Sequence, residues 1–172
     1  MRFTVFVTAV LVALATSVEA VRNLQKFKVQ AKVIEGNRKF DGLWASLYHT
    51  GAGTADVYFH NNQTAAFSAF LNNTQFQWVY TGVSQIPYAL NLQYQTYAAW
   101  GPLEVSPGYG SDYYGKGYVF KNGNQIVDKF EEWTGWLICD WWHQVPQLFW
   151  SQIGSNLKPI PTCAKVQLIA RT

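Results

Sequence analysis

Histidines and carboxylates are the residues of this chain that could support catalysis. His143 follows Asp140 by three positions, an arrangement in which a carboxylate could orient a histidine acting as a general base. No serine stands in a Gly-x-Ser-x-Gly setting to complete a triad. Glu131 and Glu132 are adjacent, so on a strand they would point to opposite faces and could not flank one glycosidic bond. We therefore predict a protein that is not an enzyme, with a secreted hydrolase kept as an alternative.

Metal binding lacks its usual sequence signatures. His49 and His60 lie at opposite ends of a predicted hairpin, and the chain has no His-x-His pair and no His-Glu-x-x-His motif. We interpret both histidines as solvated residues at strand ends. The sequence predicts no metal site and no cofactor.

Cys139 and Cys163 are the only two cysteines of the chain. In an oxidising compartment this pair is expected to form one intramolecular disulfide. A closed loop of this length stabilises the fold by about 3–4 kcal/mol through loop-closure entropy. A free catalytic cysteine would need a reduced thiol near a histidine, which an even pair in an exported protein disfavours.

The first twenty residues have the pattern of a secretory signal peptide. Arg2 provides a positive start, an apolar run of about a dozen residues follows, and the small residues Val18 and Ala20 precede the cleavage point. The run is shorter than the roughly 20 residues that a bilayer requires. We predict a signal peptide over residues 1–20, a mature domain over residues 21–172, and no membrane contact after cleavage.

Two sequons agree with secretion. Asn62 and Asn72 each begin an Asn-x-Thr tripeptide in a stretch that favours a loop or turn. We predict both as glycosylation sites of a secreted, extracellular protein, located in the host apoplast if the source is a plant pathogen.

The composition excludes some partners and suggests others. The net charge is +3 and charged residues make up only 13% of the chain, so a nucleic-acid partner is not expected. Aromatic residues make up 17%, including eight tryptophans. They could fill the inner faces of a wide β-fold, or partly reach the surface, where Tyr and Trp favour binding.

Alternation of polar and apolar residues indicates strands throughout the mature chain. Residues 26–33 alternate strictly, and their lysines would discourage edge-to-edge pairing. Asn122-Gly123 is a strong hairpin signal. No segment of twelve residues has helical periodicity, and we find no internal repeat or second domain. The sequence predicts a monomeric, single-domain, all-β antiparallel β-sandwich or barrel of roughly nine or ten short strands. The other predicted strands are residues 43–48, 55–59, 66–71, 75–80, 88–94, 117–120, 125–127, 135–139, 147–150 and 164–169.

Three loops are candidates for partner binding. Residues 102–117 form a predicted loop rich in Gly and Tyr, the composition of a binding surface rather than of a connector. An aromatic hairpin tip follows Asp140, and a Gly-rich turn over residues 50–53 could act as a thin wedge. The candidate partner-binding residues are Tyr109, Tyr113, Tyr114, Trp141, Trp142, His143, Gly51 and Gly53.

The carboxyl half resembles a family of small secreted proteins of filamentous fungi. The resemblance rests on Trp133-Thr-Gly-Trp-Leu-Ile-Cys-Asp-Trp141, Pro146-Gln-Leu-Phe-Trp150 and Cys163-Ala-Lys-Val-Gln-Leu168, with Phe27-x-Val29 and Phe40-Asp-Gly-Leu43 in agreement. Some members are similar to plant-pathogen effectors, and one of the rice blast fungus is associated with inhibition of host papain-like cysteine proteases. No Gln-x-Val-x-Gly loop of the cystatin kind is present, so no inhibitory residue is carried over.

The resemblance implies a secreted fungal effector that binds and inhibits a host extracellular protein, with a papain-like cysteine protease as the first candidate. A carbohydrate-binding module that uses exposed aromatic rings is the alternative, followed by a secreted hydrolase. The module predicts coplanar rings on one sheet face, whereas a hydrolase predicts converging carboxylates or a histidine in a pocket.

Overall fold

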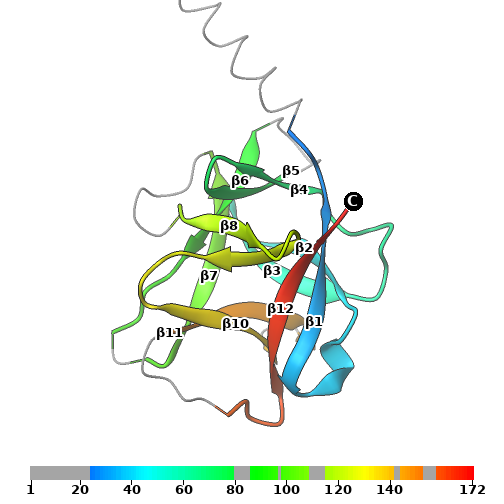
Figure 1. Ribbon diagram of the computed structural model, residues 1–172, viewed down its shortest axis with the longest axis vertical. Helices are drawn as coiled ribbons and strands as arrows, with labels where there is room; N and C mark the ends of the chain where they lie inside the picture. The colour runs from blue at the N-terminus through cyan, green and yellow to red at the C-terminus, as the bar shows by residue number, and fades with distance from the viewer. Residues whose placement is uncertain (1–23, 80–85, 97, 109–114, 142–143, 153–157) are drawn as a thin grey trace, which may run out of the picture.

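The structure is a computed structural model that describes residues 24–79, 86–96, 98–108, 115–141, 144–152 and 158–172 (Figure 1). The predicted signal peptide lies outside the described residues. So do the candidate residues Tyr109, Tyr113, Tyr114, Trp142 and His143.

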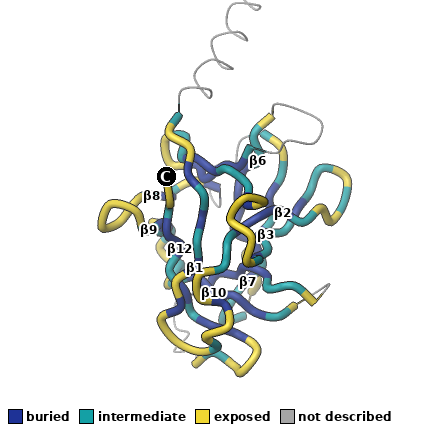
Figure 2. Tube along the Cα trace, turned by 90° about the vertical axis from the view of Figure 1, so that its right-hand side faces the viewer, coloured by how far each residue is buried: buried dark blue, intermediate teal, exposed yellow. Residues whose placement is uncertain are grey.

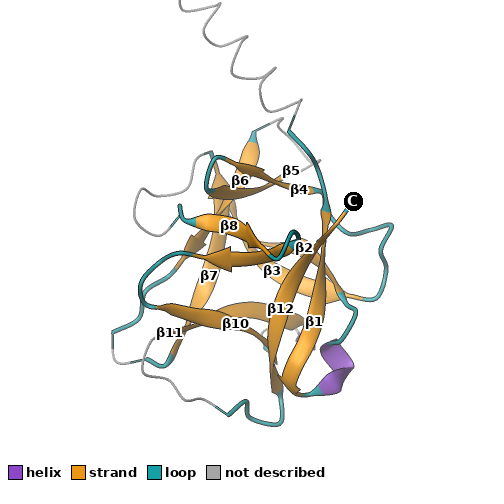
Figure 3. Ribbon diagram, viewed as in Figure 1, coloured by secondary structure: helices purple, strands orange, loops and turns teal. Residues whose placement is uncertain are grey.

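The described part of the chain is built from twelve antiparallel strands and one short 3-10 helix, η1 (Arg38–Phe40), with no α-helix (Figure 3). The strands are β1 (Lys28–Gly36), β2 (Trp44–Gly51), β3 (Thr54–His60), β4 (Ala69–Asn72), β5 (Gln75–Val79), β6 (Pro87–Leu92), β7 (Trp100–Pro107), β8 (Tyr118–Lys121), β9 (Gln125–Asp128), β10 (Trp133–Asp140), β11 (Pro146–Gln152) and β12 (Cys163–Arg171). Across these residues no helix is both long and apolar enough to cross a membrane.

The strands close into a barrel. Pairing runs from β1 through β2, β3, β7, β11, β10 and β12 back to β1, a ring of seven strands. The remaining strands extend from this ring, β6, β5 and β4 from β7, and β9 and β8 from β12. These extensions also meet, because a bridge joins Phe27 to Ala69 and the Thr74 carbonyl accepts hydrogen bonds from the N–H groups of Gly117 and Tyr118. A second closed circuit therefore runs through β1, β4, β5, β8, β9 and β12.

Three hairpins, β2–β3, β6–β7 and β10–β11, meet one another through their second strands. Their second strands β3, β7 and β11 pair with one another in all three combinations. The paired residues are Tyr58 with Gln147, Phe149 with Pro102, and Ala55 with Val105. This is the connectivity of a β-trefoil, in which three units of four strands surround a pseudo-threefold axis.

The register of the three pairings identifies equivalent positions in the three units. Val57, Leu103 and Leu148 are equivalent, 46 and 45 residues apart along the chain. The next inward set is Phe59, Val105 and Trp150. All six side chains are buried, so the three hairpins contribute matching apolar layers to one core.

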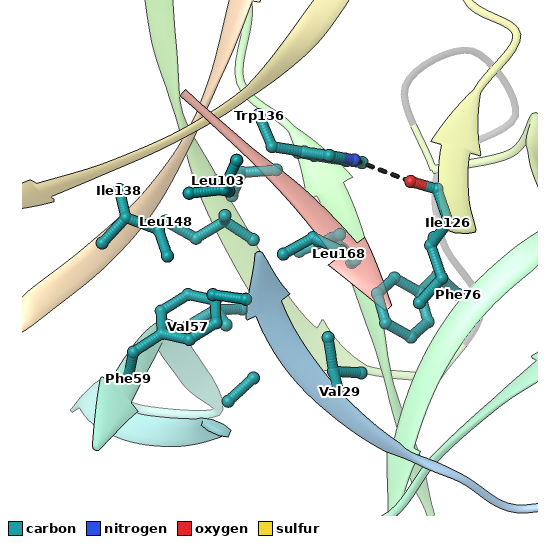
Figure 4. Packing of buried hydrophobic residues seen from close by; sticks show 14 of the residues in the cluster. Val29, Val57, Phe59, Phe76, Leu103, Ile126, Trp136, Ile138, Leu148 and Leu168 are labelled. Carbon is teal, nitrogen blue, oxygen red and sulfur yellow. Dashed lines mark hydrogen bonds between the residues drawn. The ribbon is translucent and has the colours of Figure 1, made fainter. Parts of the chain in front are cut away.

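One continuous hydrophobic core joins the buried residues of the three hairpins to those of the other strands (Figure 4). Trp136 lies across it and donates its indole N–H to the Ile126 carbonyl at 2.9 Å, which satisfies its polar atom inside the apolar interior. Strand interiors are buried, whereas the exposed stretches are mostly turns and connecting segments (Figure 2). Much of the aromatic content therefore fills the core.

The all-β fold is confirmed, as a barrel rather than a sandwich, with twelve strands instead of nine or ten. The prediction of a loop over residues 102–117 is wrong in its first half, because β7 continues to Pro107 with Leu103 and Val105 buried. Two prolines and Gly101 concealed this strand, since both residue types are depleted in strands. The sequence did not reveal the threefold repeat, because the three units share apolar residues at equivalent positions but not identical residues.

The predicted disulfide is present. Cys139 and Cys163 are bonded and lie directly opposite each other in the β10–β12 ladder. The bridge therefore joins two strands that are already neighbours, and the loop that it closes contains β11 but almost none of β10.

Candidate functional site

A small apolar pocket opens beside the disulfide and is the candidate binding site. Its volume is about 100 Å³, and its walls come from β7, β10, the residue after β10, and the segment that precedes β12. The lining residues are Trp100, Leu137, Cys139, Asp140, Trp141, Lys158, Pro159, Ile160, Thr162 and Cys163. We refer to these ten residues as the apolar pocket.

The mouth of the apolar pocket carries two large apolar side chains in contact with solvent. Trp141 is 52% exposed and Ile160 is 62% exposed. Below them Leu137, Cys139 and Cys163 are buried and form a closed floor.

Aromatic contacts hold the mouth in shape. The rings of Trp100 and Trp141 meet edge to face with centroids 5.5 Å apart, and each also contacts Phe149, at 4.9 and 5.3 Å. Such pairs contribute about 0.5–1.5 kcal/mol beyond the area that they bury. The exposed Trp141 ring is therefore oriented before any partner arrives.

The charged residues that line the apolar pocket are Asp140 and Lys158. Lys39 forms an ion pair with Asp140, which leaves that carboxylate neutralised. Lys158 is exposed at the opposite wall. The pocket thus combines an apolar interior with a polar edge that carries the charge of Lys158.

The three predicted binding residues that the structure describes lie in two separate places. Trp141 lies at the apolar pocket, against Trp100 at the start of β7. Gly51 and Gly53 lie in the β2–β3 turn, where Gly53 is beside Pro107 at the other end of β7. Seven residue steps of a strand separate those ends by about 23 Å. Trp141 and the β2–β3 turn therefore do not form one surface.

His60 ends β3, as predicted, but it is half-buried rather than solvated, whereas His49 is exposed. The N–H of Asn62 donates to His60 Nδ1 at 3.1 Å, so the ring proton is on Nε2, which lies 2.8 Å from Ser46 Oγ. Ser46 in turn donates to the Ala65 carbonyl at 3.2 Å. Burial lowers the pKa of His60. This histidine cannot take a proton from Ser46, so the pair is structural.

Asp128 is a buried carboxylate that the sequence did not single out. Burial raises its pKa to about 6, while the N–H groups of Phe130 and Lys129 act in the opposite direction. Its Oδ1 accepts the Phe130 N–H at 2.7 Å, which fixes the turn after β9. Burial, followed by the Asp128 charge, also raises the pKa of Tyr118. The pair belongs to the core and lies outside the apolar pocket.

The raised pKa of Asp128 predicts that stability falls as the pH rises. The unfolded carboxyl loses its proton near pH 4 but the folded one near pH 6, so the stabilisation is complete below about pH 4 and is lost by about pH 6. Asp128→Asn keeps an oxygen acceptor without the charge. We expect the free energy of unfolding of this variant, minus that of wild type, to increase by about 2 kcal/mol as the pH rises from 4 to 7.

Denaturant titrations at pH 4, 5, 6 and 7 measure this difference. Glu131→Gln, at an exposed position, is the matched control and should show no such trend. A constant difference between Asp128→Asn and wild type across this range would contradict the assignment.

The two sequons have different surroundings. Asn62 is exposed, and its Oδ1 accepts hydrogen bonds from the Thr64 N–H and hydroxyl at 3.0 and 2.7 Å. Asn72 is the last residue of β4 and is half-buried opposite Gln75. Glycosylation at either position stays a prediction.

Sequence reasoning missed most of the apolar pocket. Trp100, Pro159 and Ile160 come from segments that only the barrel closure brings to Trp141. The sequence feature that could have indicated the pocket is Ile160, which stands between two prolines and close to the disulfide-bonded Cys163. In the described ranges, no group of three or more His, Cys, Asp or Glu side chains could hold a metal ion.

Comparisons with solved structures show the fold alone. Full-length CARDS toxin matches 88% of this chain with a TM-score of 0.60 and 12% identity, and the match covers 28% of the toxin chain. Nicked CARDS toxin matches 87% with a TM-score of 0.58 and 12% identity, covering 26% of its chain. This chain therefore spans about a quarter of the length of those toxins.

No curated protein sequence matches the chain. A family described as "Domain of unknown function (DUF7907)" matches residues 24–172, which includes all twelve strands and the apolar pocket. The chain belongs to the DUF7907 family.

Proposed function

We propose that this protein is a secreted, non-enzymatic effector that binds a host extracellular protein through the apolar pocket. The observation that carries the proposal is an exposed Trp141 and Ile160 over a rigid, disulfide-bonded floor. Interfaces obtain most of their affinity from a few aromatic or apolar anchors in well-packed pockets. A preformed mouth also loses little conformational entropy on binding.

The pocket size supports an apolar side chain as the group that is bound. A cavity of about 150 Å³ lined by apolar residues can hold benzene. The apolar pocket, at about 100 Å³, has room for one smaller group such as a leucine or valine side chain. An apolar side chain of the partner would enter here while its backbone lies over Trp141.

A carbohydrate platform agrees less well with the ring geometry. Stacking on a sugar chain favours rings that share one plane. Trp100 and Trp141 are inclined at 84° and cannot present a common flat surface. The protein partner is therefore the better proposal.

A papain-like cysteine protease is the first partner to test, on the strength of the resemblance to secreted fungal effectors. Residues 21–172 would be titrated into an active-site-titrated plant papain-like protease with a fluorogenic peptide. We expect stoichiometric loss of activity. An unchanged rate at micromolar excess would overturn the protease as the partner, and cleavage of the added protein would show a substrate instead.

A further inference from the structure

A basic face lies on the outside of the barrel, away from the core. β1 and β12 run side by side (Figure 1), with Lys28 directly opposite Arg171 and Lys32 opposite Gln167. Residues that pair directly project to the same side of a sheet. Lys32 and Arg171 are exposed and Lys28 is half-exposed, so three cations share the outer side of these two strands.

The same side continues across the neighbouring hairpin. Ile169 of β12 pairs with both Gln30 of β1 and Gln125 of β9, and Gln125 pairs with Lys121 of β8. Lys121 is exposed at the end of that row. We define the basic face as Lys28, Lys32, Lys121 and Arg171.

In the described part of the chain, the hydrogen-bond acceptors at the centre of this face are neutral groups rather than carboxylates. Lys28 Nζ donates to the Gln63 carbonyl at 2.5 Å, and Arg171 Nε donates to Gln30 Oε1 at 3.0 Å. Both acceptors are neutral. Like charges directly opposite each other destabilise a sheet, so the Lys28–Arg171 pair opposes folding. Glu35, farther along β1, is paired with Lys165, and within the described residues no carboxylate forms an ion pair with the four cations of the basic face.

The sequence suggested that these lysines protect a free strand edge, but the strand that carries them is not at an edge. β1 pairs with β12 along almost its whole length and contacts β2 on its other side through Gln30 and Trp44. A strand with neighbours on both sides has no edge to protect. The basic row therefore lacks the folding role that alternation alone assigned to it.

We propose that the basic face binds an acidic polysaccharide, of the polyuronate class. Beside the cations lie the amides of Gln125 and Gln167, which can hydrogen-bond to hydroxyl and carboxylate groups. The Gln30 amide between them is already bonded to the Gly42 carbonyl and to Arg171. Trp44, opposite Gln30, offers a half-buried ring beside them. Ile169, at the centre of the face, is only 7% exposed, whereas Ile34 next to Lys32 is an exposed apolar group at its end.

Binding of residues 21–172 to immobilised polygalacturonate, at 50 and 300 mM NaCl, tests the proposal. The Lys32→Gln/Arg171→Gln variant removes two charges from the face. Lys116→Gln/Lys129→Gln removes two charges elsewhere and is the matched control. We expect the face variant to bind about tenfold more weakly and the control to bind like wild type, with binding weakened at high salt.

The following results would overturn the proposal. It fails if wild type does not bind polygalacturonate at 50 mM NaCl, or if both variants lose affinity equally. Binding to anionic vesicles but not to polygalacturonate would assign the face to membranes. Thermal melting of both variants keeps a folding defect separate, and we expect no lower melting temperature for the face variant, because it removes a like-charge contact.

Discussion

Cys139→Ala/Cys163→Ala is expected to lower the free energy of unfolding by about 3 kcal/mol and the melting temperature by about 10 °C. The two cysteines are 24 residues apart, and the bond restricts that loop in the unfolded chain. The native strands stay paired without it, because β10 and β12 share three further residue pairs besides the cysteines. We therefore expect a less stable protein with the same fold.

Denaturant titration with and without reductant measures this effect. Reduced wild type should approach the double variant, and the variant itself should not respond to reductant. If the variant is as stable as oxidised wild type, the loop-closure argument is wrong.

Gly101→Ala is expected to destabilise the fold by about 3 kcal/mol or more, at the upper end of overpacking effects. A Cβ at this position would overlap the Gln93 carbonyl oxygen and lie 2.5 Å from Trp150 Nε1. These two atoms form a hydrogen bond to each other at 3.2 Å, so neither can move without breaking it. Gly101 pairs with Trp150 in the ladder, which makes the glycine a requirement of the β7–β11 contact.

Gly135→Ala is the matched control for this substitution. A Cβ there meets Ser151 Oγ at 3.4 Å, an ordinary contact, so we expect a change within about 1 kcal/mol. Equal stability of the two variants in a denaturant titration would contradict the β7–β11 register.

Local patterns predicted the fold class and most strands. The alternation of residues 26–33 corresponds to β1, and Asn122-Gly123 forms the β8–β9 turn, where Asn122 has a φ of +52° and Gly123 a φ of +85°. Alternation could not show that β1 has two neighbours, or that three hairpins close on one another. Those facts depend on long-range pairing, which leaves no local signal in a single sequence.

The candidate site could be predicted only in part. Trp141 was identified from its aromatic, disulfide-linked hairpin, and it lies at the apolar pocket. Trp100 and Ile160 were not, because they are distant in sequence and their proximity follows from barrel closure. The pKa values of His60 and Asp128 could not be predicted from the sequence for a similar reason, since they are changed by burial under other segments of the chain.

The most direct test of the proposed function compares inhibition constants of two isoleucine variants against a papain-like protease. Ile160→Asp places a charge at the mouth of the apolar pocket, whereas Ile86→Asp does so at a site 49% exposed, beside β6 and remote from the pocket. We predict an inhibition constant at least about 30-fold higher for Ile160→Asp, as for a hot-spot residue, and little change for Ile86→Asp. Unchanged inhibition by a correctly folded Ile160→Asp protein would contradict the assignment of the apolar pocket, and loss of inhibition in Ile86→Asp alone would move the binding surface to the opposite end of β7.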